Sequence, residues 1–176
     1  MNLKCGITPK QFKDIIKKNL QLNNPKTIMV WGGPGIGKTE ICYQLGEEEK
    51  TPIVSMILTL YDPTEVKGLM IYDPELKIVR TVPMIDLPKE RFIFLIDEIN
   101  TAPPAVRDAC LRIIQEKKIA DTQLPEDTMI ILAGNRNQDK INPSRFTAPF
   151  INRCCHLMLE PSFDDWKEWG YVSGNI

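Results

Sequence analysis

The stretch GGPGIGKT at residues 32–39 constrains the fold of this chain more than any other part of the sequence. It lies between a short apolar run, TIMVW at residues 27–31, and a helical stretch, EICYQLGEEEK at residues 40–50. The order is therefore strand, glycine-rich loop and helix. A loop of this kind turns backbone N–H groups inward, where they can bind phosphate oxygens. The spacing Gly32-x-x-x-x-Gly37-Lys38-Thr39 predicts a phosphate-binding loop.

The residues of this loop have separate chemical roles. Lys38 supplies a cation for the β and γ phosphates of a nucleotide, and Thr39 offers a hydroxyl group to Mg²⁺. The alternative is a glycine-rich turn without a ligand, which agrees less well with a strand before the loop and a helix after it. The candidate phosphate-binding residues are Gly32, Gly33, Pro34, Gly35, Ile36, Gly37, Lys38 and Thr39.

Four further apolar runs are typical of strands that are covered on both faces. They lie at residues 52–60, 91–97, 128–134 and 155–159. Helical stretches lie between strands, the clearest at residues 103–118, and another opens the chain at residues 8–20, with Thr8 as its cap. This alternation predicts an α/β fold, a three-layer P-loop NTPase sandwich around a five-stranded parallel sheet.

The segment at residues 66–83 interrupts the alternation of strands and helices. It contains two short β-rich runs separated by the turn signal DPE, which predicts an inserted β-hairpin. Its side chains do not reveal its role, and a surface elaboration without an active role remains an alternative.

An acidic pair, Asp97 and Glu98, follows the apolar run IFLI at the end of the third predicted strand. A carboxylate at this place can reach a magnesium ion at the phosphate loop, so Asp97 is the candidate metal ligand. Glu98 is the candidate base that polarises the attacking water. Taken alone, such a pair is usually a solvated turn, but the phosphate loop upstream favours the functional interpretation.

The composition excludes several classes of protein. The chain has 176 residues and a formal net charge of −1, so it lacks the overall positive charge of many nucleic-acid-binding proteins. Its five cysteines are an odd number without the spacing of a disulfide framework. No apolar run approaches the roughly 18 residues of a membrane-spanning helix. We therefore expect one cytoplasmic domain.

Beyond the loop and FIFLIDEIN, the chain continues with ILAGN, which ends at Asn135, and with PSRFTAPFINRC, which contains Arg153. This order resembles the AAA+ ATPases, in particular their MoxR-like branch, from about residue 8 to 170. The resemblance implies that Asn135 helps to position the hydrolytic water and that Arg153 reaches the nucleotide of a neighbouring subunit. Two departures are Arg136, where proline is common, and Cys154, where an aromatic residue is common.

The resemblance also bears on the domain boundaries. Residues 1–160 correspond to the large ATPase domain, and the hairpin resembles the insertion that the MoxR-like branch carries in its second helix. Residues 161–176 are expected to form a linker towards a small helical lid domain that does not fit within this chain. Trp166 and Trp169, one helical turn apart in this segment, are predicted to anchor packing.

The stretch INRCCHLMLE at residues 151–160 holds two cysteines and the single histidine of the chain. Cys154 and Cys155 are adjacent at a strand start, so their side chains point to opposite faces and do not easily share one ion. We therefore expect buried structural cysteines, a packed His156 and no stoichiometric zinc or iron. The candidate functional residue of this stretch is Arg153.

Three functions are compatible with these patterns. The leading one is a Mg²⁺-dependent ATPase module that couples ATP hydrolysis to remodelling of a protein partner; the resemblance implies a von Willebrand factor A domain partner and a homo-oligomeric ring, commonly of six. The second is a nucleotide-dependent assembly or regulatory module with little turnover. The third is a nucleic-acid motor, which the mixed charges of the hairpin make less favoured.

Overall fold

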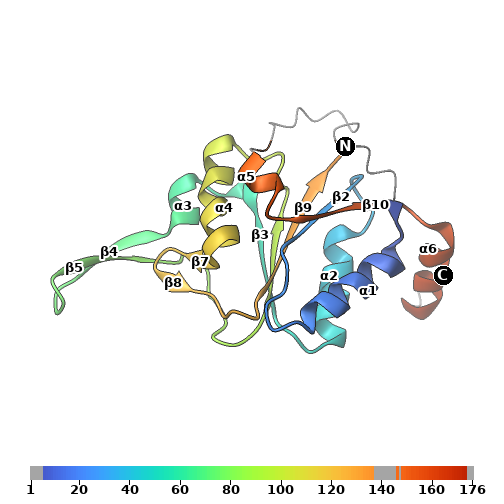
Figure 1. Ribbon diagram of the computed structural model, residues 1–176, viewed down its shortest axis with the longest axis horizontal. Coiled ribbons are helices and arrows are strands. Elements are labelled where there is room, and N and C mark those ends of the chain that lie inside the picture. Colours follow the sequence, from blue (N-terminus) through green and yellow to red (C-terminus); the bar gives the residue numbers. More distant parts are fainter. Residues whose placement is uncertain (1–5, 137–145, 147, 174–176) are drawn as a thin grey trace.

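The computed structural model describes residues 6–136, 146 and 148–173. Its centre is a parallel sheet with the strand order β1-β10-β2-β9-β6-β3 (Figure 1). The strands are β1 (Gly6–Ile7), β2 (Ile28–Gly32), β3 (Ile53–Ile57), β6 (Ile93–Asp97), β9 (Met129–Asn135) and β10 (Cys155–Leu159). The α/β fold and its parallel sheet are confirmed, whereas the expected number of five strands is wrong.

The sixth strand, β1, lies at one edge of the sheet. Gly6 and Ile7 pair with Met158 and Leu159 of β10. Two residues are too short to produce an apolar run, and helix α1 begins almost at once at Pro9, so the sequence pattern contains no sign of this strand. Its pairing depends on the presence of β10 from the far end of the chain.

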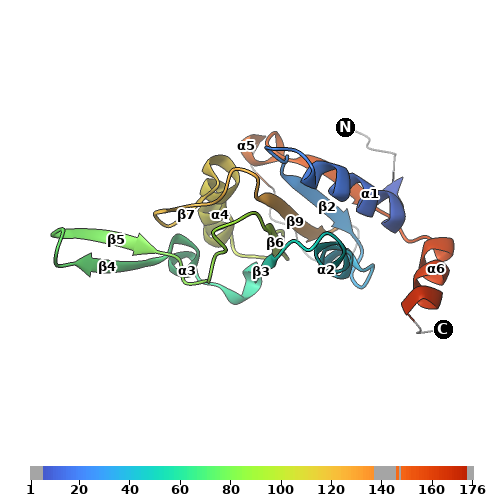
Figure 2. The ribbon, with the colours of Figure 1, turned by 90° about the horizontal axis from the view of Figure 1, so that it is seen from below.

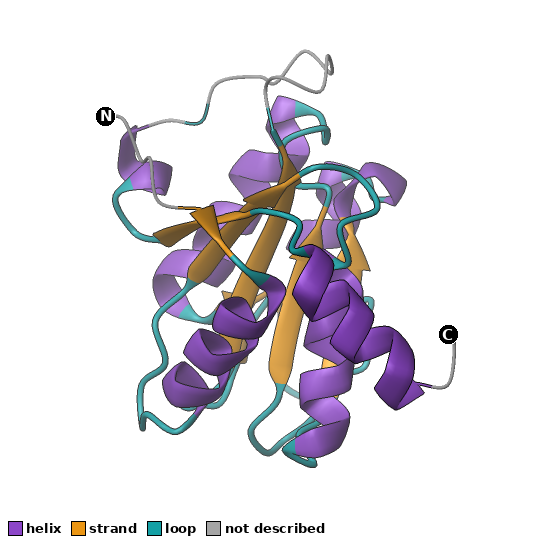
Figure 3. Ribbon diagram, turned by 90° about the vertical axis from the view of Figure 1, so that its right-hand side faces the viewer, coloured by secondary structure: helices purple, strands orange, loops and turns teal. Residues whose placement is uncertain are grey.

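Both faces of the sheet are covered by helices (Figure 3). Helices α1 (Pro9–Leu20) and α2 (Lys38–Glu48) pack on one face, and α3 (Pro63–Lys67), α4 (Pro104–Glu116) and α5 (Ala148–Ile151) pack on the other. Successive strand residues contribute to opposite cores: Ile93 and Leu95 face α1 and α2, whereas Phe94 and Ile96 face α4. Burial on both sides explains why the central strands are continuously apolar.

Helix α1 begins as the sequence predicts. The Thr8 hydroxyl accepts a hydrogen bond from the Gln11 N–H group, and the Gln11 side chain accepts one from the Thr8 N–H group, which completes a capping box. Phe12, Ile16 and Leu20 are buried, one helical turn apart. The helix therefore presents one apolar face to the sheet.

The predicted hairpin at residues 66–83 is present as β4 (Leu69–Asp73) and β5 (Ile78–Val82), which pair in antiparallel fashion. It extends from the body of the domain as an arm (Figure 2). A second hairpin, β7 (Lys118–Ile119) and β8 (Thr122–Gln123), was not predicted because its strands are two residues long. The predicted strand at 52–60 ends early, because Leu58–Leu60 form a short 3₁₀ helix.

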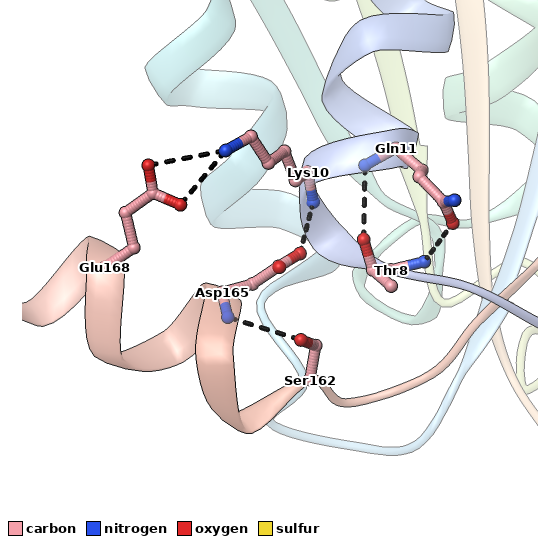
Figure 4. Close-up of polar contacts among 6 residues, drawn as sticks. All are labelled: Thr8, Lys10, Gln11, Ser162, Asp165 and Glu168. Carbon is pink, nitrogen blue, oxygen red and sulfur yellow. Dashed lines mark hydrogen bonds and ion pairs between the residues drawn. The ribbon is translucent and has the colours of Figure 1, made fainter.

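Helix α6 (Phe163–Ser173) lies beside the beginning of α1 (Figure 4). The Ser162 hydroxyl accepts from the Asp165 N–H group at 3.2 Å, as a helix cap. The Asp165 carboxylate accepts from the Lys10 N–H group at 2.8 Å, and the Lys10 ammonium group pairs with Glu168 at 3.1 Å. The carboxylate thus satisfies an N–H group in the first turn of α1, which the helix itself leaves unpaired.

The tryptophans of α6 correct an expectation. Trp166 is 54% exposed and Trp169 is 39% exposed, so neither is a buried packing anchor. Trp166 instead stacks with Phe163 of its own helix, with 6.0 Å between the ring centroids. Whether residues 161–176 are a linker remains a prediction, and residues 174–176 lie outside the described part.

Among the described residues, the structure has no helix with the length and apolar character needed to cross a membrane.

The contact between α6 and α1 is expected to depend on pH. Burial raises the pKa of Asp165, but hydrogen bonds from the Lys10 N–H group and from the hydroxyls of Thr8 and Ser162 lower it by a larger amount. The net pKa of Asp165 therefore lies below the ordinary value of 3.8. A lowered pKa stabilises the docked helix above the ordinary pKa, and this contribution is lost as pH falls through the folded-state value. We expect α6 to leave α1 only when the pH falls below the ordinary pKa of 3.8, as the docked Asp165 carboxylate becomes protonated.

Tryptophan fluorescence as a function of pH measures this release, because Trp166 and Trp169 lie on α6. The Asp165→Asn variant should lose the acid transition, since its side chain does not titrate. Asp164→Asn is the matched control on the same helix turn and should retain it. An identical transition in both variants would contradict the assignment.

Candidate active site

The phosphate loop connects β2 with α2, as the sequence predicts. Gly35 and Gly37 have φ angles of +73° and +89°, a left-handed backbone that other residues adopt only with strain. Gly37 is the N-cap of α2 and has no side chain to occupy the N–H groups of the first turn. These groups and the helix dipole therefore point into the loop, as anion binding requires.

Lys38 lies inside the loop and is only 8% exposed. Its ammonium group donates to the carbonyl oxygens of Gly32 at 3.1 Å and Gly33 at 2.9 Å, and to Oδ1 of Asn135 at 3.1 Å. Asn135 ends β9 and is the register partner of Gly32. The structure thus brings together two predicted site residues that are far apart in the sequence.

The predicted magnesium ligands also meet. The Thr39 hydroxyl donates to Oδ2 of Asp97 at 2.5 Å, so the start of α2 and the end of β6 are joined at the same edge of the sheet. A hydroxyl and a carboxylate are hard oxygen donors. They suit Mg²⁺, which commonly binds through one or two protein groups together with substrate phosphates. The residues present therefore fit the ion that the loop motif implies.

Glu98 follows Asp97 with a φ angle of +55°. A left-handed backbone is strained for a glutamate, and strain of this kind is concentrated at functional sites. The turn is held by the Thr101 hydroxyl, which donates to the Glu98 carbonyl at 2.9 Å. The Glu98 carboxylate accepts from the Thr59 hydroxyl at 2.6 Å. The sequence pattern does not indicate Thr59, because a threonine after a strand is not a distinctive signal.

Asn100 is a second residue of this region that the sequence pattern does not indicate. Its side chain is hydrogen-bonded to the backbone of Asn135 on both the N–H and the carbonyl side. The sequence signal available was its position two residues after the acidic pair.

Arg153 lies apart from these residues. It precedes β10, whose first residue, Cys155, is in register with Ile28 at the beginning of β2. The phosphate loop follows the other end of β2, four residues further on, which corresponds to about 13 Å of strand. Arg153 is exposed and stands beyond the amino-terminal edge of the sheet. The structure does not bring it to the loop of the same chain.

The cysteines follow the prediction only in part. Cys42 and Cys110 are buried and Cys154 is half-buried, but Cys155 is exposed, so the expectation of buried cysteines is wrong for Cys155. It is the first residue of β10. Cys5 lies outside the described residues. Among the residues that the structure describes, no group of three or more histidine, cysteine or acidic side chains is arranged to hold a metal ion.

His156 is packed by specific contacts, as predicted. Its Nδ1 atom accepts from the Trp31 indole N–H group at 2.9 Å, and its Nε2 atom lies 2.9 Å from the Ile151 carbonyl oxygen. The imidazole and indole rings are nearly parallel, at 11°. In this arrangement the neutral ring uses both nitrogens, one as acceptor and one as donor.

The family assignment comes from a sequence model described as "ATPase family associated with various cellular activities (AAA)", which matches residues 27–141. The chain belongs to the MoxR-type AAA ATPase family. The matched range covers the phosphate loop, the acidic pair and Asn135, and membership in this AAA family implies ATP binding. Arg153 lies outside it.

A solved structure supports the fold of this AAA domain. The crystal structure of a "putative ATPase" from Cytophaga hutchinsonii superimposes with a TM-score of 0.65 at 19% sequence identity. The match covers 94% of this chain and 51% of that one, so this chain spans about half of the length of that protein. No curated protein sequence matches this chain.

Thiol reactivity should distinguish the cysteines of the AAA domain. Burial raises the pKa of Cys42 and Cys110 to about 12 and that of Cys154 to about 11, so few of these thiols ionise at pH 8. We expect iodoacetamide to modify Cys155 first among these four, as measured by peptide mass spectrometry. In urea all four should react alike. Equally fast modification of Cys42 in the native protein would contradict the burial.

Proposed function

We propose that this chain is a Mg²⁺-dependent ATPase module that couples ATP hydrolysis to remodelling of a protein partner. The observation that carries the proposal is the convergence of four groups at one edge of the sheet. The Lys38 ammonium group contacts Asn135, and the Thr39 hydroxyl contacts Asp97. In parallel sheets of this type, ligands bind at the carboxyl ends of the strands, which is where these residues lie.

Each group has a defined task in the proposed reaction. The N–H groups of Gly33 and of residues 35–39, together with the Lys38 ammonium group, bind the phosphates, and Thr39 and Asp97 would hold the magnesium ion. The ion, when bound, neutralises charge that develops on the phosphate oxygens. Glu98 accepts a proton from the attacking water, and Asn135 orients that water. The Thr59 hydroxyl holds the Glu98 carboxylate in one orientation.

Arg153 is proposed to act on the nucleotide of a neighbouring subunit. It stands beyond the amino end of β10, whereas the phosphate loop follows the carboxyl end of the neighbouring β2, at the opposite edge of the sheet. An arginine at the γ-phosphate stabilises the charge of the transition state and is worth roughly 10³-fold or more in rate. The proposal therefore includes a homo-oligomer in which each active site lies between two chains.

The hairpin β4–β5 supports a protein partner over nucleic acid. Seven of its side chains are apolar or aromatic and exposed: Leu69, Met70, Ile71, Tyr72, Leu76, Ile78 and Val79. Its Arg80 guanidinium group is paired with Asp73 at 3.1 Å, so that cation is partly neutralised. Binding to a phosphate backbone requires unpaired cations, whereas apolar side chains suit a protein surface. A von Willebrand factor A domain partner rests on the family resemblance alone.

Glu98→Gln separates binding from hydrolysis. The amide keeps the size of the side chain but does not accept the proton, so turnover should fall by at least ~10²-fold. Binding of a fluorescent ATP analogue with Mg²⁺ should persist, whereas Lys38→Ala should abolish it. Glu47→Gln, on the exposed side of α2, is the matched control and should change neither value. Normal hydrolysis by Glu98→Gln would exclude Glu98 as the base.

Arg153 can be tested by mixing inactive chains. Arg153→Ala and Lys38→Ala should each hydrolyse ATP poorly, and their mixture should regain part of the activity, because an intact loop of one chain meets an intact arginine of the other. The specific activity of the native chain should rise with protein concentration. Arg112→Ala, an exposed arginine on α4, is the control.

Two outcomes would reject this assignment. A specific activity that does not depend on concentration, together with an inactive mixture of folded variants, would exclude a role across the interface. A native chain that binds ATP but does not turn it over at any concentration would favour the assembly module instead.

A further inference from the structure

Asn100 forms a two-bond connection to the backbone of Asn135. Its Nδ2 atom donates to the Asn135 carbonyl oxygen at 2.9 Å, and its Oδ1 atom accepts from the Asn135 N–H group at 2.9 Å. The side chain is buried, with 1% exposed. A carboxamide facing a peptide group in this way imitates the pairing of two strands.

The connection lies where pairing of the backbones has ended. Strands β6 and β9 are in register from Ile93 with Met129 to Ile96 with Leu132. Beyond this point the Ile99 N–H group still donates to the Ala133 carbonyl oxygen at 3.1 Å. The chain has turned away at Glu98, so the side chain of Asn100 makes the next two hydrogen bonds in place of a backbone.

Asn135 is therefore held from both sides. Its register partner on β2 is Gly32, the first residue of the phosphate loop, and Asn100 holds the opposite side. The Asn135 side chain then reaches the Lys38 ammonium group at 3.1 Å. Asn100 links the loop that carries Glu98 to the strand that carries Asn135.

The residue types on both sides suit this link. Asparagine is a short side chain with a donor and an acceptor on one planar group, whereas aspartate lacks the donor and serine has a single oxygen. A Cβ atom at Gly134 would lie 2.9 Å from Oδ1 of Asn100 and 2.8 Å from Cε of Met29, which is too close. Glycine at 134 thus allows the close approach.

We propose that Asn100 is a positioning residue for ATP hydrolysis, which acts by holding Asn135 in place relative to Lys38 and Glu98. This rests on the proposed ATPase function. The link does not touch the loop residues that bind phosphate, so its loss should slow hydrolysis while nucleotide binding persists. A purely structural role would instead lower binding and hydrolysis together.

Asn19 provides a matched control, because its side chain makes the same pair of bonds away from the site. Its Nδ2 atom donates to the Lys26 carbonyl oxygen at 2.8 Å, and its Oδ1 atom accepts from the Lys26 N–H group at 2.9 Å. Lys26 precedes β2, at the sheet edge opposite the phosphate loop. Asn19→Ala removes an equivalent pair of bonds without altering the nucleotide residues.

The experiment measures the affinity for a fluorescent ATP analogue and the rate of ATP hydrolysis at high protein concentration for the native chain, Asn100→Ala, Asn19→Ala and Asn135→Ala. We expect Asn100→Ala to retain affinity within about 3-fold and to lose at least ~10-fold in turnover, as is typical for groups that orient site residues. Asn19→Ala should match the native rate. If Asn100→Ala does not fold, Asn100→Ser enters the same comparison, since it keeps a polar group.

The double variant Asn100→Ala/Asn135→Ala shows whether Asn100 acts through Asn135. If it does, the double variant is no slower than Asn135→Ala alone. Additive losses, turnover of Asn100→Ala within about 2-fold of the native chain, or a parallel loss of affinity and rate would each overturn the proposal. A native chain that fails to bind or hydrolyse ATP overturns the proposed function itself, which separates the two failures.

Discussion

The hydrogen bonds of the buried Lys38 ammonium group are the interaction on which the candidate site depends. A buried cation is costly unless acceptors surround it, and here the acceptors are two loop carbonyl groups and the Asn135 side chain. The carbonyl groups are available because Gly35 and Gly37 adopt a left-handed backbone. The asparagine is available because β9 is the neighbour of β2. The loop is thus held in shape by its own cation.

The parallel strand order has a second consequence. The residues proposed to bind nucleotide follow the carboxyl ends of β2, β6 and β9, whereas Arg153 precedes the amino end of β10. A rigid sheet keeps these two edges apart within one chain. If Arg153 contacts a nucleotide, it therefore contacts that of another copy. Oligomerisation would then be a condition for catalysis, in agreement with an arginine that is exposed on the surface of a single chain.

The turn after β6 combines strain with a dense set of hydrogen bonds. The left-handed backbone of Glu98 costs roughly 1–2 kcal/mol, and the bonds made by Thr101 and Asn100 stabilise the same turn. The Glu98 carboxylate is also held by Thr59, after β3. The segment after β3, the turn after β6 and the end of β9 thus together determine where the Glu98 carboxylate points. Such a site can be sensitive to substitutions that do not contact the nucleotide.

The sequence by itself determined the local chemistry of this protein. The glycine-rich loop between a strand and a helix, the capping residue of α1 and the inserted hairpin are present where the sequence predicts them, because each depends on neighbouring residues and on backbone preferences that neighbouring residues set. The phosphate loop shows this best, since its glycines define its shape before any distant contact forms.

The tertiary structure alone decided which distant residues meet. The pairing of β1 with β10, the hydrogen bond from Thr59 to Glu98 and the two bonds from Asn100 to Asn135 each join segments that are far apart along the chain. Exposure was decided in the same way: Cys155 and Trp166 are apolar in character yet lie at the surface, because no described element covers them. A local pattern records what a residue can do, whereas strand order and register determine which partner it finds.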